Sequence, residues 1–444
     1  MNLYQNNRKK LMGLLTDGLI LVVSSEEKQR NSDVDYRFRQ DSDFLYLTNI
    51  TSPGYALILD PKSKKSHLVI PDISQLHQIW VGKQLTTQDA KKMFGVDTVH
   101  YAADVAKLLP TLLKKYKKIH ALPSGLKWLQ SQKCRFTGKK DSDTLRVTLN
   151  EMRVRKSAAE IELLKIANRI SNQAHIEAMT GIRTQMHEYQ VQAILEKTFL
   201  DNGASHMAYP SIVATGKNAA ILHYHDNNMP LESNDLLLID AGCEWNGYAA
   251  DITRTFPVSG KFTSEQRDIY QIVLDAQKEC IALIRPGVAM LDLHNHACRS
   301  MTQGLMRLGI LHDHDIDDII KSEAHTIFFP HGIGHLLGLD VHDVGAKDPK
   351  AKPIKNKPKT LRASRTLEPG FVVTIEPGIY FIAAHFESKA TRKKFAKFIN
   401  WTRADSYRSV GGIRIEDDIL VTAKGHENLT ETPKEISDIE NLMA

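Results

Sequence analysis

Short apolar runs separated by helix-like stretches fill the first third of the chain. Residues 18–24, 44–48, 55–59 and 67–70 are predicted strands because each is a short, mainly apolar run, and residues 104–118 are a predicted helix. Strands that alternate with helices indicate a small α/β domain built on a mixed sheet.

The pattern changes to a helical period at about residue 157. Ser157 and Glu160 have the spacing of a capping box, and apolar residues follow at helical spacing from Ile161 to Ile170. We therefore predict a long helix that begins near Ser157. The predicted domain boundary lies there, between residues 1–156 and 157–444.

The second part combines further helices with an antiparallel hairpin. Residues 236–243 and 248–256 are predicted strands joined by Asn246-Gly247, a strong two-residue hairpin turn. Helices are expected over 264–284 and 290–308. Helices combined with hairpins indicate an α+β domain. No repeat with a period of about 20–50 residues is present, which excludes solenoids and propellers.

Composition narrows the class of protein. The 444 residues are 42% apolar and 25% charged, which excludes a disordered chain. No apolar run approaches the ~18 residues of a membrane span, and the polar N-terminus does not resemble a signal peptide. Four scattered cysteines without a C-x-x-C pair indicate free thiols in a reducing compartment. A cytoplasmic protein without a membrane partner is the expectation.

Charge gives only a weak indication of a partner. The formal net charge is +6, with lysine-rich stretches at 114–118, 347–359 and 392–394. Solvated loops are the favoured interpretation, and a docking patch for an acidic partner is the alternative. No basic face interleaved with aromatic residues is present, so no nucleic-acid partner is expected.

The hairpin carries two aspartates that we expect to lie close together. Pairing Trp245 with Tyr248 places Asp240 and Asp251 on one face as diagonal neighbours, roughly 7–8 Å apart between backbones. Beside the apolar residues 236–239 these carboxylates would repel each other unless a cation or proton lies between them. The alternative is a solvated hairpin with two surface acids.

Three further segments add candidate ligands. Residues 328–343 contain His331, His335 and His342 among glycines, and imidazole suits both divalent metals and proton transfer. Glu376 and Glu416 each interrupt an apolar, strand-like run. A salt bridge with Arg414 on the same strand face is the simpler explanation of Glu416. Together the set is oxygen-rich and free of thiolate, which favours a pair of manganese- or cobalt-like ions over structural zinc.

These segments resemble the metal-dependent proline peptidases of the pita-bread fold, aminopeptidase P and prolidase. The resemblance covers nearly the whole chain, in ordered motifs at residues 30–46, 238–242, 251–257, 331–345, 376–378 and 414–418. It implies an α+β catalytic domain with pseudo-twofold symmetry, an antiparallel sheet flanked by helices, and a smaller α/β domain before it. It also implies a proline-containing peptide as substrate and a homo-oligomer, either a dimer or a tetramer.

The resemblance further implies a role for each site residue. Asp240 and Asp251 would hold one ion, Asp251 and Glu416 would bridge, and His335 and Glu376 would complete the other ion. Mn²⁺ is expected, with Co²⁺ or Zn²⁺ as alternatives. A bridging hydroxide would attack the carbonyl before proline, and Glu376 would pass its proton toward the prolyl nitrogen. His342 would stabilise the oxyanion. His223 and His331 would handle protons, and Arg414 would hold Glu416 or the substrate pocket.

Aminopeptidase P is favoured over prolidase on the first domain and the hairpin motif. Arg362, fourteen residues before Glu376, is the main counter-indication, because prolidases carry an arginine there that binds the carboxylate of a dipeptide. An ordinary loop cation is the other explanation of Arg362. A pita-bread binding module without catalysis is a third possibility, and the five intact ligand positions argue against it.

Overall fold

The computed structural model describes residues 2–351, 358 and 360–444. Its internal contacts divide the chain into two compact units, Met1–Arg153 and Val154–Ala444. Most of the lysine-rich stretch 347–359, namely 352–357 and 359, lies outside the described residues. Within the described residues, no helix combines the length and the apolar character that a bilayer crossing needs.

The first unit is built on a six-stranded mixed sheet with the order β6-β5-β4-β1-β7-β8. The central strand β1 (Leu19–Val23) pairs antiparallel with β4 (Ala56–Asp60) and parallel with β7 (Lys118–Ala121). The other strands are β5 (Lys65–Ile70), β6 (Thr98–Tyr101) and β8 (Lys139–Asp141), with a separate hairpin of β2 (Gln29–Asn31) and β3 (Val34–Asp35). The helices are α1 (Leu3–Leu14), α2 (Ser42–Thr48), α3 (Gln75–Val81), α4 (Thr87–Phe94), α5 (Val105–Leu113), α6 (Pro123–Ser131) and α7 (Asp143–Val154).

The predicted mixed sheet is therefore present, but three local predictions were wrong. Residues 44–48 form helix α2, not a strand. The helix expected over 104–118 ends at Leu113, because the chain turns at Lys114–Lys117 into β7. Arg392–Lys394, expected in a loop, lie in helix α14 (Lys389–Phe395).

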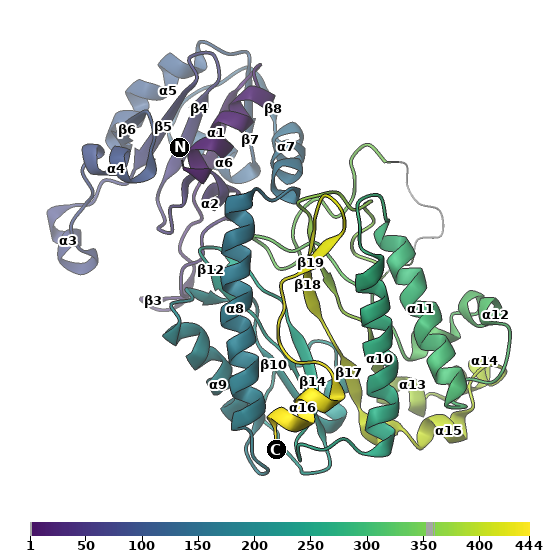
Figure 1. The fold of residues 1–444 in the computed structure, drawn as a ribbon. Helices are drawn as coiled ribbons and strands as arrows, with labels where there is room; N and C mark the ends of the chain where they lie inside the picture. Colours follow the sequence, from purple (N-terminus) through teal and green to yellow (C-terminus); the bar gives the residue numbers. More distant parts are fainter. Residues whose placement is uncertain (1, 352–357, 359) are drawn as a thin grey trace. The chain divides into compact units, whose positions relative to one another are not determined.

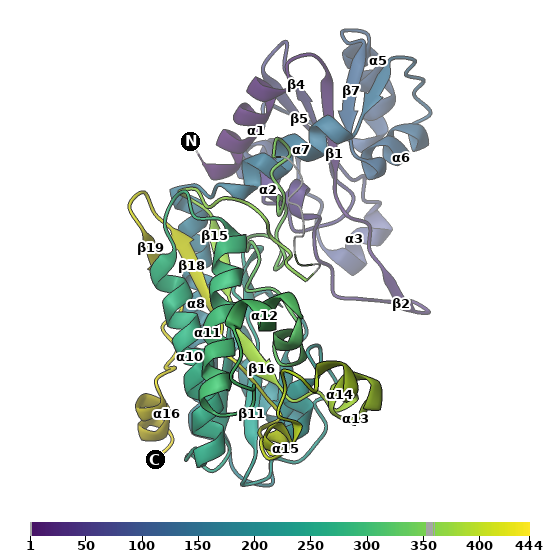
Figure 2. The same cartoon turned by 90° about the vertical axis from the view of Figure 1, so that its right-hand side faces the viewer.

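The second unit consists of two similar halves, each with a helix pair and a three-stranded antiparallel sheet (Figure 1). In the first half, α8 (Ala158–Gly181) and α9 (Glu188–Asp201) accompany β10 (Ile212–Thr215), β11 (Leu236–Asp240) and β14 (Thr253–Pro257). In the second half, α10 (Ser264–Leu283) and α11 (Met290–Arg307) accompany β15 (Val372–Ile375), β18 (Asp417–Val421) and β19 (His426–Asn428). Two views show α8, α10 and the C-terminal helix α16 (Ile436–Leu442) on one side of these strands (Figures 1 and 2).

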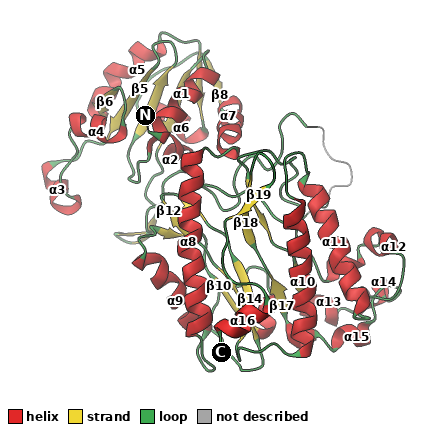
Figure 3. Ribbon diagram, in the orientation of Figure 1, coloured by secondary structure: helices red, strands yellow, loops and turns green. Residues whose placement is uncertain are grey.

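Shorter elements complete this unit (Figure 3). Strands β16 (Gly378–Tyr380) and β17 (Gly412–Arg414) pair with each other, and β12 (Cys243–Trp245) lies between β9 (His206–Met207) and β13 (Tyr248–Ala249). The remaining helices are α12 (Ile316–Lys321), α13 (Ala383–Glu387), α14 and α15 (Trp401–Asp405). The capping box at Ser157 and Glu160 starts α8 as predicted.

The hairpin keeps its predicted register but its strands are interrupted. Trp245 pairs with Tyr248 across Asn246-Gly247, both of which have a positive φ. The long strands predicted on either side are each split in two, β11 and β12 before the turn and β13 and β14 after it. At the break, a Cβ on Gly242 would lie 1.9 Å from the carbonyl oxygen of Ala250. Only glycine permits the two strands to approach this closely, and the contact lies next to Asp240 and Asp251.

Candidate metal centre

Thr253 brings together acids from the two halves of the second unit. Asp240, the last residue of β11, pairs with Thr253 at the start of β14. Glu416, between β17 and β18, forms an isolated bridge with the same threonine. The Thr253 hydroxyl donates to Oε2 of Glu416 at 2.7 Å, and Asp251 lies two residues earlier. Two distant segments of the sequence thus meet at one point.

The histidine-rich segment joins this point through β15. Leu336 forms an isolated bridge with Val373, and the Glu376 amide donates to the Ile333 carbonyl at 2.9 Å. His335 Nε2 then lies 3.3 Å from Oδ2 of Asp251 and 3.7 Å from Oε1 of Glu376. Ligand atoms of Asp251, His335 and Glu416 all lie within 4.8 Å of one another, and the three residues are buried.

The carboxyl groups of this cluster lack enough compensating positive charge. Burial raises the pKa of Asp240, raises that of Glu376 to about 7 and raises that of Glu416 well above its usual value. Neighbouring carboxylates raise all three pKa values further, and Arg414 opposes them. Oδ1 of Asp240 is buried without a hydrogen-bond partner among the described residues. Divalent cations fit such a donor set, since they supply the missing charge and a partner for the orphaned oxygen.

His335 responds to the same excess of negative charge. Burial alone would lower the pKa of its imidazole, but the hydrogen bond to Asp251 and the charge of Glu376 outweigh burial and raise it to about 9. Nδ1 of the ring lies 3.1 Å from the Leu336 carbonyl, which orients Nε2 toward the carboxylates. A metal on Nε2 would take the place of the proton that this environment favours.

Arg414 contacts two acids of the cluster: Glu416, which the sequence suggested, and Asp240, which lies closer. Its guanidinium forms a hydrogen-bonded ion pair with Asp240, whereas its nearest approach to Oε2 of Glu416 is 3.9 Å. It also donates to Thr253 Oγ1 and to the Tyr380 hydroxyl, at 3.0 Å each. Arg414 is thus mainly a partner of Asp240, and Thr253 is the direct partner of Glu416.

His331 belongs to a hydrogen-bonded chain with Tyr380 and Arg414. Nδ1 of His331 lies 2.8 Å from the Gly332 carbonyl and therefore carries the proton, so Nε2 accepts from the Tyr380 hydroxyl at 2.8 Å. Burial, then the charge of Arg414, lowers the pKa of His331 to about 3. The ring is 3.7 Å from Oε2 of Glu376. The neutral imidazole of His331 thus lies beside the carboxyl group of Glu376, which is expected to carry a proton.

His342, His223 and Arg362 lie on the exposed side of the cluster. The ring of His342 stands perpendicular to that of His335, with centroids 4.4 Å apart. Burial, then the charges of His335 and Arg362, lowers its pKa to about 4. His223 stacks on His225 and also influences His342, and Arg362 influences His331 as well. All the predicted site residues therefore lie in or beside the cluster. They form a buried set (Asp251, His335, Arg414 and Glu416), a partly buried set (Asp240, His331 and Glu376) and an exposed set (His223, His342 and Arg362).

Three residues of the cluster carried no predicted role. Thr253 and Tyr380 make the bonds described above. Thr253 lies inside the motif 251–257 and Tyr380 lies two residues after the motif 376–378, so alternation along their strands could have indicated them. Tyr209 lies in a segment without a motif. Burial, followed by the charges of Asp240, Asp251 and Glu416, raises the pKa of its hydroxyl well above the usual value.

Comparison with known proteins agrees with this architecture. Residues 162–423 match the model of metallopeptidase family M24, and residues 4–120 match that of the aminopeptidase P N-terminal domain. A probable Xaa-Pro aminopeptidase of Tuber melanosporum is 38% identical over 96% of this chain and 91% of its own. One from Metarhizium acridum is 40% identical over 93% and 82%.

Solved structures give the same result for the fold. Proline aminopeptidase P II of Yersinia pestis superposes with a TM-score of 0.86 at 38% identity, covering 100% of this chain and 99% of its own. Aminopeptidase P of E. coli with the inhibitor Pro-Leu has a TM-score of 0.86 at 36% identity, covering 99% and 97%. A Zn-substituted form of the E. coli enzyme, in complex with product, has a TM-score of 0.85. The chain therefore belongs to metallopeptidase family M24 and has the pita-bread catalytic fold and the N-terminal domain of aminopeptidase P.

Proposed function

We propose that this enzyme removes the N-terminal residue of peptides whose second residue is proline, using two divalent cations. One observation carries the proposal: Asp251, His335 and Glu416 converge within 4.8 Å in a buried cluster whose carboxyl groups lack compensating charge. The relatives named above as Xaa-Pro aminopeptidases support the choice of bond.

The donor set supports two ions of the manganese type. Asp240 and Asp251 would hold one ion, Asp251 and Glu416 would lie between both, and His335 and Glu376 would complete the other. Carboxylates with one imidazole and no thiolate suit Mn²⁺, and Co²⁺ or Zn²⁺ can use the same donors. When bound, such ions lower the pKa of a water molecule and polarise the scissile carbonyl.

The protein's own groups would then manage the proton and the developing charge. Glu376, with its pKa raised to about 7, can accept a proton near neutral pH and release it toward the prolyl nitrogen. Like any amide nitrogen, that nitrogen must gain a proton to leave as an amine, and the Xaa-Pro nitrogen carries no N–H of its own before this step. His342, on the exposed side, would stabilise the oxyanion. His331, fixed by Tyr380 and the Gly332 carbonyl, would lie beside the outer oxygen of Glu376. Arg414 would hold Asp240, and His223 would contact substrate beside His342.

A paired assay of substrate and metal content tests this function. With Mn²⁺, the enzyme should cleave an Xaa-Pro-Xaa tripeptide and leave Xaa-Ala-Xaa intact. Asp251→Ala should lose bound metal and reduce kcat by roughly 10³-fold or more, since a ligand shared by both ions is removed. Asp313→Ala, which removes an exposed aspartate of the same unit, is the matched control. Full activity of Asp251→Ala, or of metal-stripped enzyme, would contradict the proposal.

A dipeptidase activity is the second candidate, and the position of Arg362 favours it. The side chain is exposed, yet its charge acts on both His331 and His342. Thr360, two residues earlier, lies against the histidine loop, where a Cβ on Gly332 would be 2.9 Å from the Thr360 carbonyl oxygen. A cation at this rim could pair with the free carboxylate of an Xaa-Pro dipeptide.

Replacing Arg362 separates the two candidate substrates. If Arg362 binds a dipeptide carboxylate, Arg362→Ala should cost about 2–5 kcal/mol of dipeptide binding and leave tripeptide cleavage nearly unchanged. Arg408→Ala, at an exposed arginine paired with Glu387, is the control. If Arg362→Ala affects both substrates equally, or affects neither, the dipeptidase candidate is rejected and the aminopeptidase is the remaining candidate.

The cysteines bear on the cellular setting. Cys134, Cys243, Cys280 and Cys298 are all free, which supports a reducing compartment, and we propose the cytoplasm. We also propose a homo-oligomer, a dimer or a tetramer, whose interface includes helix α3.

A further inference from the structure

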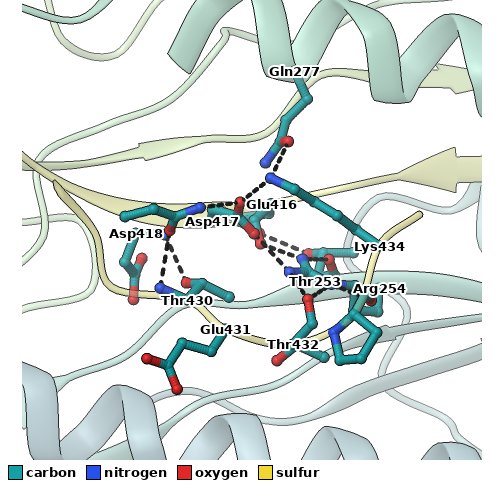
Figure 4. A network of polar contacts seen from close by, with 12 residues as sticks. Thr253, Arg254, Gln277, Glu416, Asp417, Asp418, Thr430, Glu431, Thr432 and Lys434 are labelled. Carbon is teal, nitrogen blue, oxygen red and sulfur yellow. Dashed lines mark hydrogen bonds and ion pairs between the residues drawn. The ribbon is translucent and has the colours of Figure 1, made fainter. Parts of the chain in front are cut away.

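A buried polar network adjoins the candidate metal ligand Glu416 (Figure 4). At its centre is Arg254, which is fully buried and forms an ion pair of 2.7 Å with Asp417, also fully buried. Nη1 of Arg254 donates to the main-chain carbonyls of Thr253, at 2.9 Å, and of Glu416, at 2.8 Å. One guanidinium therefore binds the main chain on both sides of the isolated bridge between Thr253 and Glu416.

A second carboxylate in this network holds the other shared ligand. Oδ2 of Asp418 accepts from the Asp251 amide at 3.0 Å and from Nδ2 of Asn168 on helix α8 at 2.9 Å. Asp417 and Asp418 are thus successive residues of β18 that fix the backbones beside Glu416 and at Asp251. Neither side chain belongs to the proposed ligand set.

The C-terminal strap, residues 430–434 between β19 and α16, closes the network. Carbonyl oxygens of Thr432 and Pro433 accept from Arg254 at 2.8–3.2 Å. Lys434 donates to Asp417 and Gln277. The strap follows the end of the family match at residue 423, so the metallopeptidase model does not include it.

Helix α8 fastens the strap through Asn172. Oδ1 of this buried side chain accepts from the Glu431 amide at 3.2 Å, the Thr432 amide at 3.3 Å and the Thr432 hydroxyl at 2.7 Å. One turn earlier, Asn168 accepts from the Thr430 hydroxyl at 3.1 Å. A continuous path of hydrogen bonds therefore runs from α8 through the strap and Arg254 to Glu416.

We propose that the C-terminal strap, held by Asn172, and Arg254 are positioning elements that keep Asp251 and Glu416 at the separation that the metal ions need. The physical reason is the repulsion among the buried carboxylates, which would drive the two strands apart whenever the site is empty or partly filled. Outer hydrogen-bond partners of metal ligands typically control affinity by about 10–100-fold. The inference rests on the proposed role of Asp251 and Glu416 as ligands.

Metal affinity of the full-length enzyme tests the inference. In Asn172→Ala the strap loses three hydrogen bonds, and in Arg254→Lys an ammonium replaces the guanidinium whose Nη1 donates to the Thr253 and Glu416 carbonyls. Both variants should bind Mn²⁺ about 10–100-fold more weakly in competition with a chelator. The controls are Gln173→Ala, an exposed neighbour on α8 that bonds Glu177, and Arg267→Ala, which breaks an exposed ion pair with Glu440 of α16. Both controls should keep wild-type affinity.

Two further readouts separate positioning from a purely structural role. The rise in Tm that saturating Mn²⁺ produces should shrink in the two variants, because that rise depends on affinity. Their activity should approach the wild-type value when Mn²⁺ is raised well above the weakened Kd. A structural role would instead lower the Tm of metal-free and metal-loaded protein equally and leave affinity unchanged, and that result would overturn the inference.

A ligand variant distinguishes this failure from failure of the proposed site. If Glu416→Ala retains both ions, the proposed metal site is wrong. If Glu416→Ala loses metal while Asn172→Ala binds it as tightly as wild type, the site stands and the positioning role is wrong. Should Arg254→Lys not fold, Asn172→Ala decides alone, because alanine is favourable in the interior of α8.

Discussion

At the residue scale, the folded protein shifts the pKa values of several titratable groups in the cluster. His335 has a pKa raised to about 9 and Glu376 a pKa raised to about 7, so both bind protons more tightly in the folded chain than in the unfolded one. The stability that His335 contributes is complete below pH 6.5 and is lost as the pH rises toward 9. Glu376 contributes in the same way, and its contribution to stability is lost as the pH rises from about 4.5 to 7.

We therefore predict that metal-free enzyme loses stability above pH 6.5. The pKa values of His331 and His342 are lowered to about 3 and 4, so these two residues make stability increase with pH, but only below pH 6.5. Between pH 6.5 and 8.5 the Tm of metal-free protein should fall by roughly 5 °C. Thermal unfolding in EDTA across this range measures the effect.

Metal-loaded protein is the control for this prediction. Its Tm should be nearly constant or should rise over the same range, because protons compete with metal for His335 and the carboxylates. A metal-free protein that becomes more stable from pH 6.5 to 8.5 would contradict the assigned charge balance.

The sequence could indicate the proposed ligands but not all of their partners. Asp240, Asp251, His335, Glu376 and Glu416 lie in local motifs, and each motif is readable by itself. The ion pair of Arg414 with Asp240 joins residues 174 positions apart, so no local pattern reveals it. Strand alternation suggested Glu416 as the partner of Arg414, and the two do form an ion pair of 3.9 Å, but tertiary packing adds Asp240 as the closer partner.

At the element scale, helix α2 shows where an apolar run was ambiguous. Residues 44–48 were predicted as a strand, yet every residue of α2 is buried and the segment is helical. Runs this short do not distinguish a strand from a buried helix. The informative signals were at the ends, where Asp41 caps the Phe44 amide and Asn49 adopts the left-handed conformation that ends the helix.

Glycines set how closely the elements of the site approach one another. A Cβ on Gly334 would lie 1.9 Å from the Thr374 carbonyl oxygen, and the next residue is His335. Gly334→Ala should therefore push the histidine loop away from β15. We predict a loss of about 3 kcal/mol in the free energy of unfolding together with weaker metal binding. Denaturant unfolding and metal titration measure the two effects.

Gly425→Ala is the matched control for this substitution. No atom lies within 4 Å of a Cβ at Gly425, and its φ is not positive, so its stability should change by less than about 0.5 kcal/mol. If Gly334→Ala matches this control in both measurements, the close approach does not position His335.

At the scale of the whole molecule, the two units differ in what they provide. Every predicted ligand and its partners lie in Val154–Ala444, where two similar halves meet at the bridge of Thr253 and Glu416. The first unit is built on its own six-stranded sheet and contributes no residue to the predicted ligand set. It presents instead an unusual surface on helix α3.

Helix α3 exposes apolar side chains that a folded chain normally covers. Leu76, Ile79, Trp80 and Val81 are 71%, 77%, 81% and 57% exposed. A cluster of this kind marks a contact with another molecule, and Trp80 is of the type that dominates interface energies. We propose that this surface forms the contact between copies of the enzyme.

Replacing Ile79 and Trp80 by serine should therefore lower the oligomeric state. Two large apolar side chains would no longer be buried on association, and loss of such anchors typically costs about 2–4 kcal/mol each. Light scattering after gel filtration should show a dimer or tetramer for the wild type and a smaller species for the double variant. Leu14→Ser, at an exposed apolar residue of α1 in the same unit, should keep the wild-type mass. An unchanged mass in the double variant would remove α3 from the interface, because the apolar area that drives association would have to lie elsewhere.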